Sequence, residues 1–292
     1  MANHPKPKLG IALGSGSARG WSHIGVIRAL AEAGVEPDIV CGCSIGAFVG
    51  AAYVNGDLDE LENWVTRLHW KDVLGLLDVS FNGGLIKGDK LIDFFSRRFV
   101  DHDFNALGKP FACVATDLEN GREIWLREGS VAEAVRASIA MPGLFKPSLR
   151  DGRLLVDGGL VNPVPVSLCR ALGADLVIAV DLGSERPGRG RRSSDAVVSE
   201  SWKARLLQGL GMGSANTEAL PSMLEVMAAS LHIMQVRITR SRLAGEPADV
   251  VLSPRLAELG LMDYHRGSEA IAEGRAAVER MWPVIRHVLE AS

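Results

Sequence analysis

The sequence has few of the features that mark disulfide-rich, nucleic-acid-binding or membrane-spanning proteins. Its 292 residues include four cysteines, and their spacing matches neither a disulfide framework nor a zinc site. We therefore expect a reducing, cytoplasmic setting and no bound metal. The net charge of -3 provides no basic field for nucleic acid, so we expect no such partner. No run of about 20 apolar residues occurs, so no membrane span is expected.

The composition is that of an ordinary globular protein. Hydrophobic residues make up 47% of the chain and charged residues 23%, and a chain of this length can bury a large core. Strand-like apolar runs alternate with helix-like segments, which predicts an α/β fold with parallel strands. We expect one domain over residues 1–292. Its parts would be a core at about 9–182, a flexible basic loop or lid at about 184–220, and C-terminal helices with a last strand at 220–292.

A glycine-rich loop follows the first predicted strand. Residues 9–13 are apolar, residues 14–20 read Gly-Ser-Gly-Ser-Ala-Arg-Gly, and residues 21–33 have helical spacing. A loop between a strand and a helix places backbone N–H groups where an anion can bind. The loop does not match the dinucleotide-binding motif, because the last glycine of G-x-G-x-x-G is missing. It does not match the Walker motif either, because the Gly-Lys-Ser/Thr ending is missing. An oxyanion hole and a plain tight turn are the remaining interpretations.

A second loop of the same kind contains a serine. Residues 38–43 are a predicted strand, residues 42–46 have the G-x-S-x-G pattern around Ser44, and an Ala-rich helix follows. This context is typical of a nucleophile elbow, in which the serine lies at a sharp turn above a helix N-terminus. The alternative is that Ser44 only caps the helix. Because parallel strands end at one edge of the sheet, we expect the two loops to lie side by side there.

A nucleophilic serine needs a base, and the sequence favours a carboxylate over a histidine. Asp157 ends a predicted strand and is followed by two glycines. A carboxylate in a partly dry site can have a pKa high enough to accept the serine proton, although Asp-Gly is also a common turn pair. Of the later histidines, His232 and His287 fall in predicted helices and only His265 lies in a predicted loop. His265 is therefore the one to test for a triad, which is the less favoured arrangement.

Three further segments bear on how a substrate would bind. Apolar residues at 74–81 are interpreted as part of the core or as the lining of an acyl pocket. Residues 186–192 are basic and glycine-rich, which is typical of a solvated loop or of a contact to anionic lipid head groups. The stretch at 202–212 has the pattern of a short amphipathic lid.

In this order, the motifs resemble the patatin-like phospholipase family, specifically its short bacterial single-domain members. The resemblance rests on the first loop, which ends Ser17-Ala18-Arg19-Gly20, on the elbow at Ser44 and on the Asp-Gly-Gly turn at Asp157. Segments at 23–26, 137–145 and 162–165 support it. With the last predicted strand at 248–254, the likeness covers nearly the whole chain.

The resemblance implies a three-layer α/β/α fold with a mostly parallel central sheet and a serine lipid acyl hydrolase of the phospholipase A or lysophospholipase type. Ser44 would be the nucleophile and Asp157 its base, a dyad that needs no histidine, metal or cofactor. The oxyanion hole would be built by Gly16, Ser17, Ala18 and Arg19. The motif glycines would be Gly14, Gly20, Gly42, Gly46, Gly158 and Gly159. Arg19 would orient the loop or meet a substrate phosphate.

Two other functions stay open at this point. They are a hydrolase of soluble carboxylesters or thioesters, and a weakly active regulatory module on the same fold. The second arises because this chain has Ser15 and Ser17 where the family often has consecutive glycines, and a positive φ is costlier for serine. The expected partner is a lipid or ester substrate, and a peripheral contact with a membrane surface is an open alternative.

Overall fold

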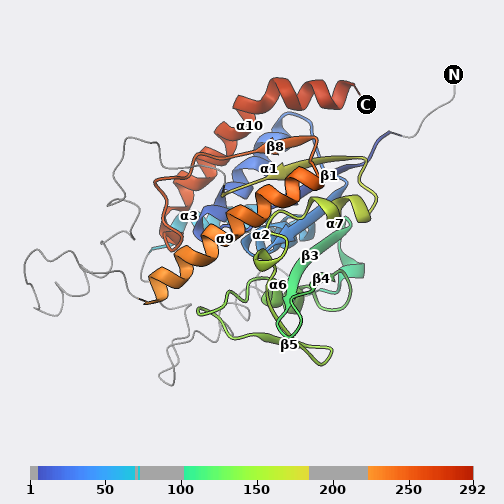
Figure 1. Cartoon of the computed structure of the whole chain (residues 1–292). Helices are drawn as coiled ribbons and strands as arrows, with labels where there is room; N and C mark the ends of the chain where they lie inside the picture. The colour runs from blue at the N-terminus through green and yellow to red at the C-terminus, as the bar shows by residue number, and fades with distance from the viewer. Residues whose placement is uncertain (1–5, 70–71, 73–101, 184–222, 292) are drawn as a thin grey trace, which may run out of the picture.

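The computed structural model describes residues 6–69, 72, 102–183 and 223–291, and within them the chain forms one eight-stranded sheet between helices (Figure 1). The predicted α/β fold with a mostly parallel central sheet is confirmed. The strands are β1 (Leu9–Leu13), β2 (Ile39–Cys43), β3 (Phe111–Asp117), β4 (Glu123–Leu126), β5 (Ser148–Arg150), β6 (Arg153–Asp157), β7 (Leu176–Val180) and β8 (Val250–Leu252).

The strands are hydrogen-bonded in the order β5-β6-β3-β2-β1-β7-β8, and β4 also pairs with β3. The pairs from β3 through β2, β1 and β7 to β8 are parallel, whereas β4, β5 and β6 pair antiparallel. Every residue of β1, β2 and β3 is buried, as expected for strands that helices cover on both faces. The loops that follow β1 and β2 therefore lie at the same edge of the sheet.

The register explains how two strand ends come to face each other. Residues 113 and 114 of β3 pair with both β2 and β4, and residues 115 and 116 pair with both β4 and β6. A strand has only two edges, so β6 continues along the edge of β3 where β2 stops, and it runs in the opposite direction. Cys43 pairs with Val114, and Asp157 pairs with the next residue, Ala115. The carboxyl ends of β2 and β6 consequently meet head to head.

Helices cover both faces of this sheet. The α-helices are α1 (Ser22–Glu32), α2 (Ile45–Asn55), α3 (Leu58–Arg67), α6 (Val131–Ser138), α7 (Val166–Ala171), α9 (Met223–Gly245) and α10 (Gly267–Glu290). The short 3-10 helices are η1 (Ser17–Trp21), η2 (Phe104–Ala106), η3 (Gly158–Leu160) and η4 (Tyr264–Arg266). The larger apolar core lies against α1, α2, α6 and α10, and the smaller one lies against α7 and the end of α9. Figure 1 shows α9 crossing in front of the sheet.

Several sequence predictions fall on segments that the structure does not describe. The apolar stretch at 74–81, the basic stretch at 186–192 and the amphipathic stretch at 202–212 all lie outside the described residues, as does most of the predicted loop or lid at 184–220. Among the described helices, none combines the length and the hydropathy that crossing a bilayer requires.

Candidate active site

Ser44 lies at the sharp turn between β2 and α2, in a backbone conformation that residues with side chains seldom adopt. Its φ is 55° and its ψ is -124°. The glycines on either side are required by close backbone contacts. A Cβ on Gly42 would lie 2.5 Å from the backbone of Ala47, and one on Gly46 would lie 2.1 Å from the carbonyl oxygen of Leu13. The predicted G-x-S-x-G pattern therefore marks a strained turn packed tightly against β1 and α2.

A buried hydroxyl group holds this turn in place. The Ser44 backbone N–H donates to Ser138 Oγ at 2.9 Å, and Ser138 Oγ donates to the carbonyl oxygen of Val114 at 2.7 Å. Ser138 is the last residue of α6 and is completely buried. The elbow is thereby tied to β3 through a side chain that lies far from it in the sequence.

Ser44 and Asp157, the two residues predicted to carry the chemistry, are in direct contact. Ser44 Oγ donates a hydrogen bond to Asp157 Oδ2 at 2.6 Å. The other carboxylate oxygen, Oδ1, accepts from the backbone N–H of Gly159 at 2.7 Å. Thr116 Oγ1 donates to the Asp157 carbonyl oxygen at 2.8 Å, which fixes the end of β6 against β3. Both oxygens of the carboxylate are thus engaged, and one of them faces the serine.

The surroundings of Asp157 make it a stronger base than an ordinary aspartate. Burial raises the pKa of its carboxyl from 3.8 to about 6, and the hydrogen bonds from Ser44 and Gly159 oppose the rise. A carboxylate with this pKa is still ionised at neutral pH, and it has a higher affinity for a proton than an exposed one has. It is therefore suited to accept the Ser44 proton during nucleophilic attack.

The glycine-rich loop supplies backbone donors beside the serine. The N–H of Ala18 donates to Leu261 at 3.1 Å, and the N–H of Arg19 donates to Gly16 at 3.2 Å. Among the described residues, no acceptor bonds the N–H groups of Gly16 and Ser17, which leaves these two donors unused by the fold. Of the four residues predicted to form the oxyanion hole, Gly16 and Ser17 are the ones whose amides remain for a substrate.

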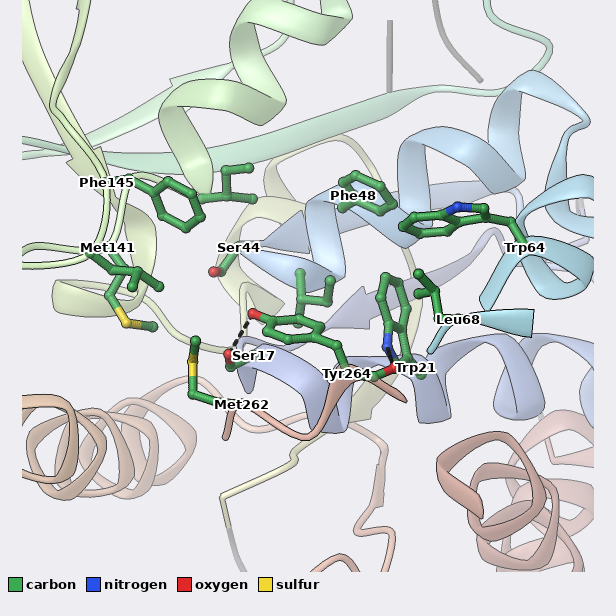
Figure 2. Close-up of a pocket in the computed structure, with 13 residues that line it drawn as sticks. Ser17, Trp21, Ser44, Phe48, Trp64, Leu68, Met141, Phe145, Met262 and Tyr264 are labelled. Atoms are coloured by element: carbon green, nitrogen blue, oxygen red, sulfur yellow. Dashed lines mark hydrogen bonds between the residues drawn. The ribbon is translucent and has the colours of Figure 1, made fainter. Parts of the chain in front are cut away.

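Ser17 has a positive φ, the backbone conformation that the sequence analysis identified as costlier for serine than for glycine. Its φ is 53°, in the region that favours glycine. Its Oγ lies 2.6 Å from the hydroxyl oxygen of Tyr264 in η4, as Figure 2 shows. Tyr264 was not singled out in the sequence, because nothing in its local pattern indicates a partner 247 residues away. The hydrogen bond stabilises the loop in a conformation that serine otherwise disfavours.

Arg19 is held within the protein. Its Nε donates to the Leu259 carbonyl oxygen at 2.9 Å, and its Nη1 lies 3.5 Å from Nε2 of His232. Both contacts join the glycine-rich loop to segments near the C-terminus. They favour the first of the two predicted roles for Arg19, which is to orient the loop.

The histidines of the described residues do not take part in a triad. None of them hydrogen-bonds Ser44 or Asp157 there. His265, the candidate from the sequence, lies in η4. His23 is completely buried, and burial lowers its pKa to about 4, while its Nε2 lies 2.8 Å from the Gly14 carbonyl oxygen. Within the described part of the chain, no group of three or more metal-ligating side chains converges.

An apolar pocket that opens to solvent adjoins the serine (Figure 2). It is lined by Ser17, Trp21, Ser44, Ile45, Phe48, Trp64, Leu68, Ile139, Met141, Leu144, Phe145, Met262 and Tyr264. Trp21 packs edge-on against the rings of Phe48, Trp64 and Tyr264, each at a centroid distance of 6.0 Å. A pocket with this lining suits a hydrocarbon chain. The sequence placed a candidate acyl pocket at 74–81 and missed these residues, which come from several elements.

Serine hydrolases of the α/β type share this arrangement, in which an elbow serine contacts its base beside free backbone donors. The chain belongs to the patatin-like phospholipase family, because the sequence model of that family matches residues 11–170. This membership supports a lipid hydrolase. The match includes the glycine-rich loop, Ser44 and Asp157, and it ends before α9, β8 and α10.

Individual relatives agree with this assignment. An uncharacterized NTE family protein of Mycobacterium tuberculosis is 34% identical over 323 residues, which cover 92% of this chain and 90% of that protein. The human patatin-like phospholipase domain-containing protein 6 is 35% identical over 184 residues, 61% of this chain and 13% of that protein. Lysophospholipase nte1 of Emericella nidulans is 34% identical, over 60% of this chain and 12% of its own length. The solved structure of VipD from Legionella pneumophila aligns with 99% of this chain and 78% of its own, at 15% identity and a TM-score of 0.42, too distant a likeness to inform function.

Proposed function

We propose that this protein hydrolyses acyl esters of lipids, as a phospholipase A or lysophospholipase, with a Ser44–Asp157 dyad. The observation that carries the proposal is the hydrogen bond of 2.6 Å from Ser44 Oγ to the buried Asp157 carboxylate. The family assignment and the lysophospholipase name of the fungal relative support a lipid substrate.

The proposed reaction has two steps that use the same groups. Ser44 Oγ attacks the ester carbonyl carbon while its proton passes to Asp157 Oδ2. The carbonyl oxygen becomes an oxyanion, which accepts hydrogen bonds from the free N–H groups of Gly16 and Ser17. The ester C–O bond then breaks, the alcohol leaves with the proton from Asp157, and the acyl group stays on Ser44. Water then attacks the acyl carbon while Asp157 takes its proton. The bond between the acyl carbon and Ser44 Oγ breaks, the proton returns from Asp157 to Oγ, and the fatty acid is released.

The apolar surroundings favour a lipid over a small soluble ester. The pocket beside Ser44 is lined mostly by aromatic and aliphatic side chains, which suit a hydrocarbon tail. Apolar side chains are also exposed at the pocket and on α9: Met262, which lines the pocket, is 44% exposed, and Ile233 and Met234 of α9 are 61% and 49% exposed. Such a surface suits a protein that works on aggregated substrate, and we propose a peripheral contact with a lipid surface here.

Hydrolysis assays with the wild type and Ser44→Ala test this proposal. We expect fatty acid release from micelles of a monoacyl glycerophospholipid and from diacyl phospholipid vesicles. The value of kcat/KM should exceed that for a short-chain p-nitrophenyl ester by about tenfold or more, because the short chain leaves most of the pocket unfilled. Removing the nucleophile should lower turnover by about 10³-fold or more.

Ser230→Ala is the matched control, because Ser230 is an exposed serine on α9 outside the pocket, and we expect it to retain wild-type rates. Turnover of soluble esters alone would support the soluble hydrolase instead. No turnover of any ester would favour the regulatory module.

A further inference from the structure

A second, more polar pocket meets the apolar pocket at the nucleophile. It lies between the glycine-rich loop and α9, and it shares Ser17, Ser44 and Met141 with the first pocket. The residues that line it are Ser15, Gly16, Ser17, Ser44, Met141, Ala228, Leu231, His232, Gln235 and Leu261. The four from α9 lie outside the part of the chain that the family model matches. We call this site the α9 pocket.

Gln235 places a buried amide group in the α9 pocket. Gln235 is 8% exposed, and its side chain packs on the turn that follows Asp157. A Cβ on Gly159 would lie 2.4 Å from Gln235 Nε2 and 2.9 Å from Asp157 Oδ1. The absence of a side chain at Gly159 therefore makes room for this amide next to the carboxylate.

Within the described part of the chain, no group hydrogen-bonds the side-chain amide of Gln235. The amide offers two donor hydrogens and one acceptor oxygen. Gln235 lines the α9 pocket and its polar atoms are not among the fully buried side-chain atoms that lack partners, so a ligand in the pocket can reach them.

His232 adds a second polar group with a defined protonation state. Arginine can only donate, so the His232 Nε2 that lies 3.5 Å from Arg19 Nη1 is the acceptor, and a neutral ring then carries its proton on Nδ1. Burial and the charge of Arg19 lower the pKa of His232 to about 4, so the ring is neutral at neutral pH. The α9 pocket is thus lined by neutral donors and acceptors, with the cation of Arg19 behind them.

The two pockets match the two halves of an ester whose carbonyl carbon lies at Ser44. The apolar pocket suits the acyl chain, and the polar one suits the alcohol. We propose that the α9 pocket binds the alcohol half of the substrate, and that Gln235 recognises a hydroxyl oxygen of a glycerol-type alcohol. This inference rests on the proposed function, and it assigns the choice of leaving group to a helix outside the matched family region.

A pair of esters with one acyl chain and different alcohols tests this assignment. The pair is 1-decanoyl-glycero-3-phosphocholine and p-nitrophenyl decanoate, and the variant is Gln235→Met, which keeps the side-chain length and removes both polar atoms. In an acyl-enzyme mechanism kcat/KM reports steps in which the alcohol is still attached, and deacylation is common to both esters. We expect kcat/KM to fall by about tenfold or more for the glycerol ester and by less than about threefold for the p-nitrophenyl ester.

Two further variants keep the test decisive. Ser230→Ala, on the exposed side of the same helix, should leave both rates unchanged. Gln235→Asn keeps the amide but withdraws it by one methylene, and it should shift the ratio of the two rates in the same direction, so that it replaces Gln235→Met if that variant does not fold.

An equal loss of kcat/KM on both esters would overturn the inference, because it would place Gln235 in the acylation chemistry that both esters share or in the structure. An unchanged ratio of the two rates would overturn it as well. If the wild type hydrolysed neither ester, the proposed function would be refuted and the inference with it.

Discussion

A hydroxyl group from elsewhere in the chain holds the backbone of Ser44, and another holds that of Asp157. Ser138 accepts from the Ser44 N–H, and Thr116 donates to the Asp157 carbonyl oxygen. The contact between Ser44 and Asp157 could be predicted, since glycines at fixed spacing surround each of them. Ser138 and Thr116 could not be assigned roles, because a single hydroxyl in a helix or strand carries no local sign of its partner.

The raised pKa of Asp157 leads to a prediction about pH. A carboxyl group must be ionised to accept the Ser44 proton, and burial raises its pKa to about 6. We expect kcat/KM to fall as the pH drops through about 6 and to reach a plateau above about pH 7. The measurement is a pH profile on an ester whose own charge does not change over this range. A profile that is flat down to about pH 4 would show that Asp157 has an ordinary pKa or is not the base.

The contact between Ser17 and Tyr264 predicts that removing the tyrosine hydroxyl lowers kcat and that a second substitution, at Ser17, restores it. Tyr264→Phe keeps the ring in the pocket and removes the hydroxyl group that lies 2.6 Å from Ser17 Oγ. We expect kcat to fall by about tenfold, because the loop that carries the free amides is no longer held in its strained conformation. Ser17→Gly in the same background should restore much of the rate, since glycine adopts a positive φ freely. Additive losses in the double variant would contradict this account.

At the scale of elements, the head-to-head meeting of β2 and β6 is what places the dyad. The strands themselves were predicted, but the direction of β6 and its continuation along the edge of β3 were not. A hydrophobic pattern identifies a strand and says nothing of its neighbours. A helix around His232 was likewise predicted, and it is observed as α9, but its position over the site was not predicted. Arg242 anchors it there, through bonds to Glu123 at 2.6 Å and to the Val161 carbonyl oxygen at 3.1 Å.

The crossing of α1 and α10 gives a prediction about stability. A Cβ on Gly25 would lie 1.9 Å from the Ile271 carbonyl oxygen, and one on Gly274 would lie 2.0 Å from that of Ser22. The two helices therefore touch through their backbones. Gly25→Ala should force them apart and lower the free energy of unfolding by about 2 kcal/mol or more.

Urea denaturation measures this effect, and Gly245→Ala is the control. Gly245 ends α9 with open space around it, so its replacement should change the free energy of unfolding by less than about 1 kcal/mol. Equal stability of the two variants would contradict this prediction, because it would show that α1 and α10 can move apart without lowering the free energy of unfolding.

At the scale of the whole molecule, the site draws on more of the chain than its motifs do. The fold class, the two loops and the carboxylate follow from residues 11–170, where the family model also matches. The C-terminal part adds Tyr264 to the glycine-rich loop and His232 and Gln235 to the α9 pocket. These contributions depend on contacts between residues far apart in the sequence, and no local pattern predicts them. We accordingly expect the choice of the alcohol half of the substrate to depend on the C-terminal elements, and the chemistry to reside in the matched region.

The central claim is that Asp157, and not a histidine, activates Ser44. Its most direct test is the rate at which a fluorophosphonate labels the protein at about pH 8, with the modified residue located by mass spectrometry. We predict one adduct on Ser44, a labelling rate lower by about 100-fold or more in Asp157→Asn, and an unchanged rate in His265→Gln. An adduct on another residue, or a rate in Asp157→Asn equal to that of the wild type, would contradict the claim.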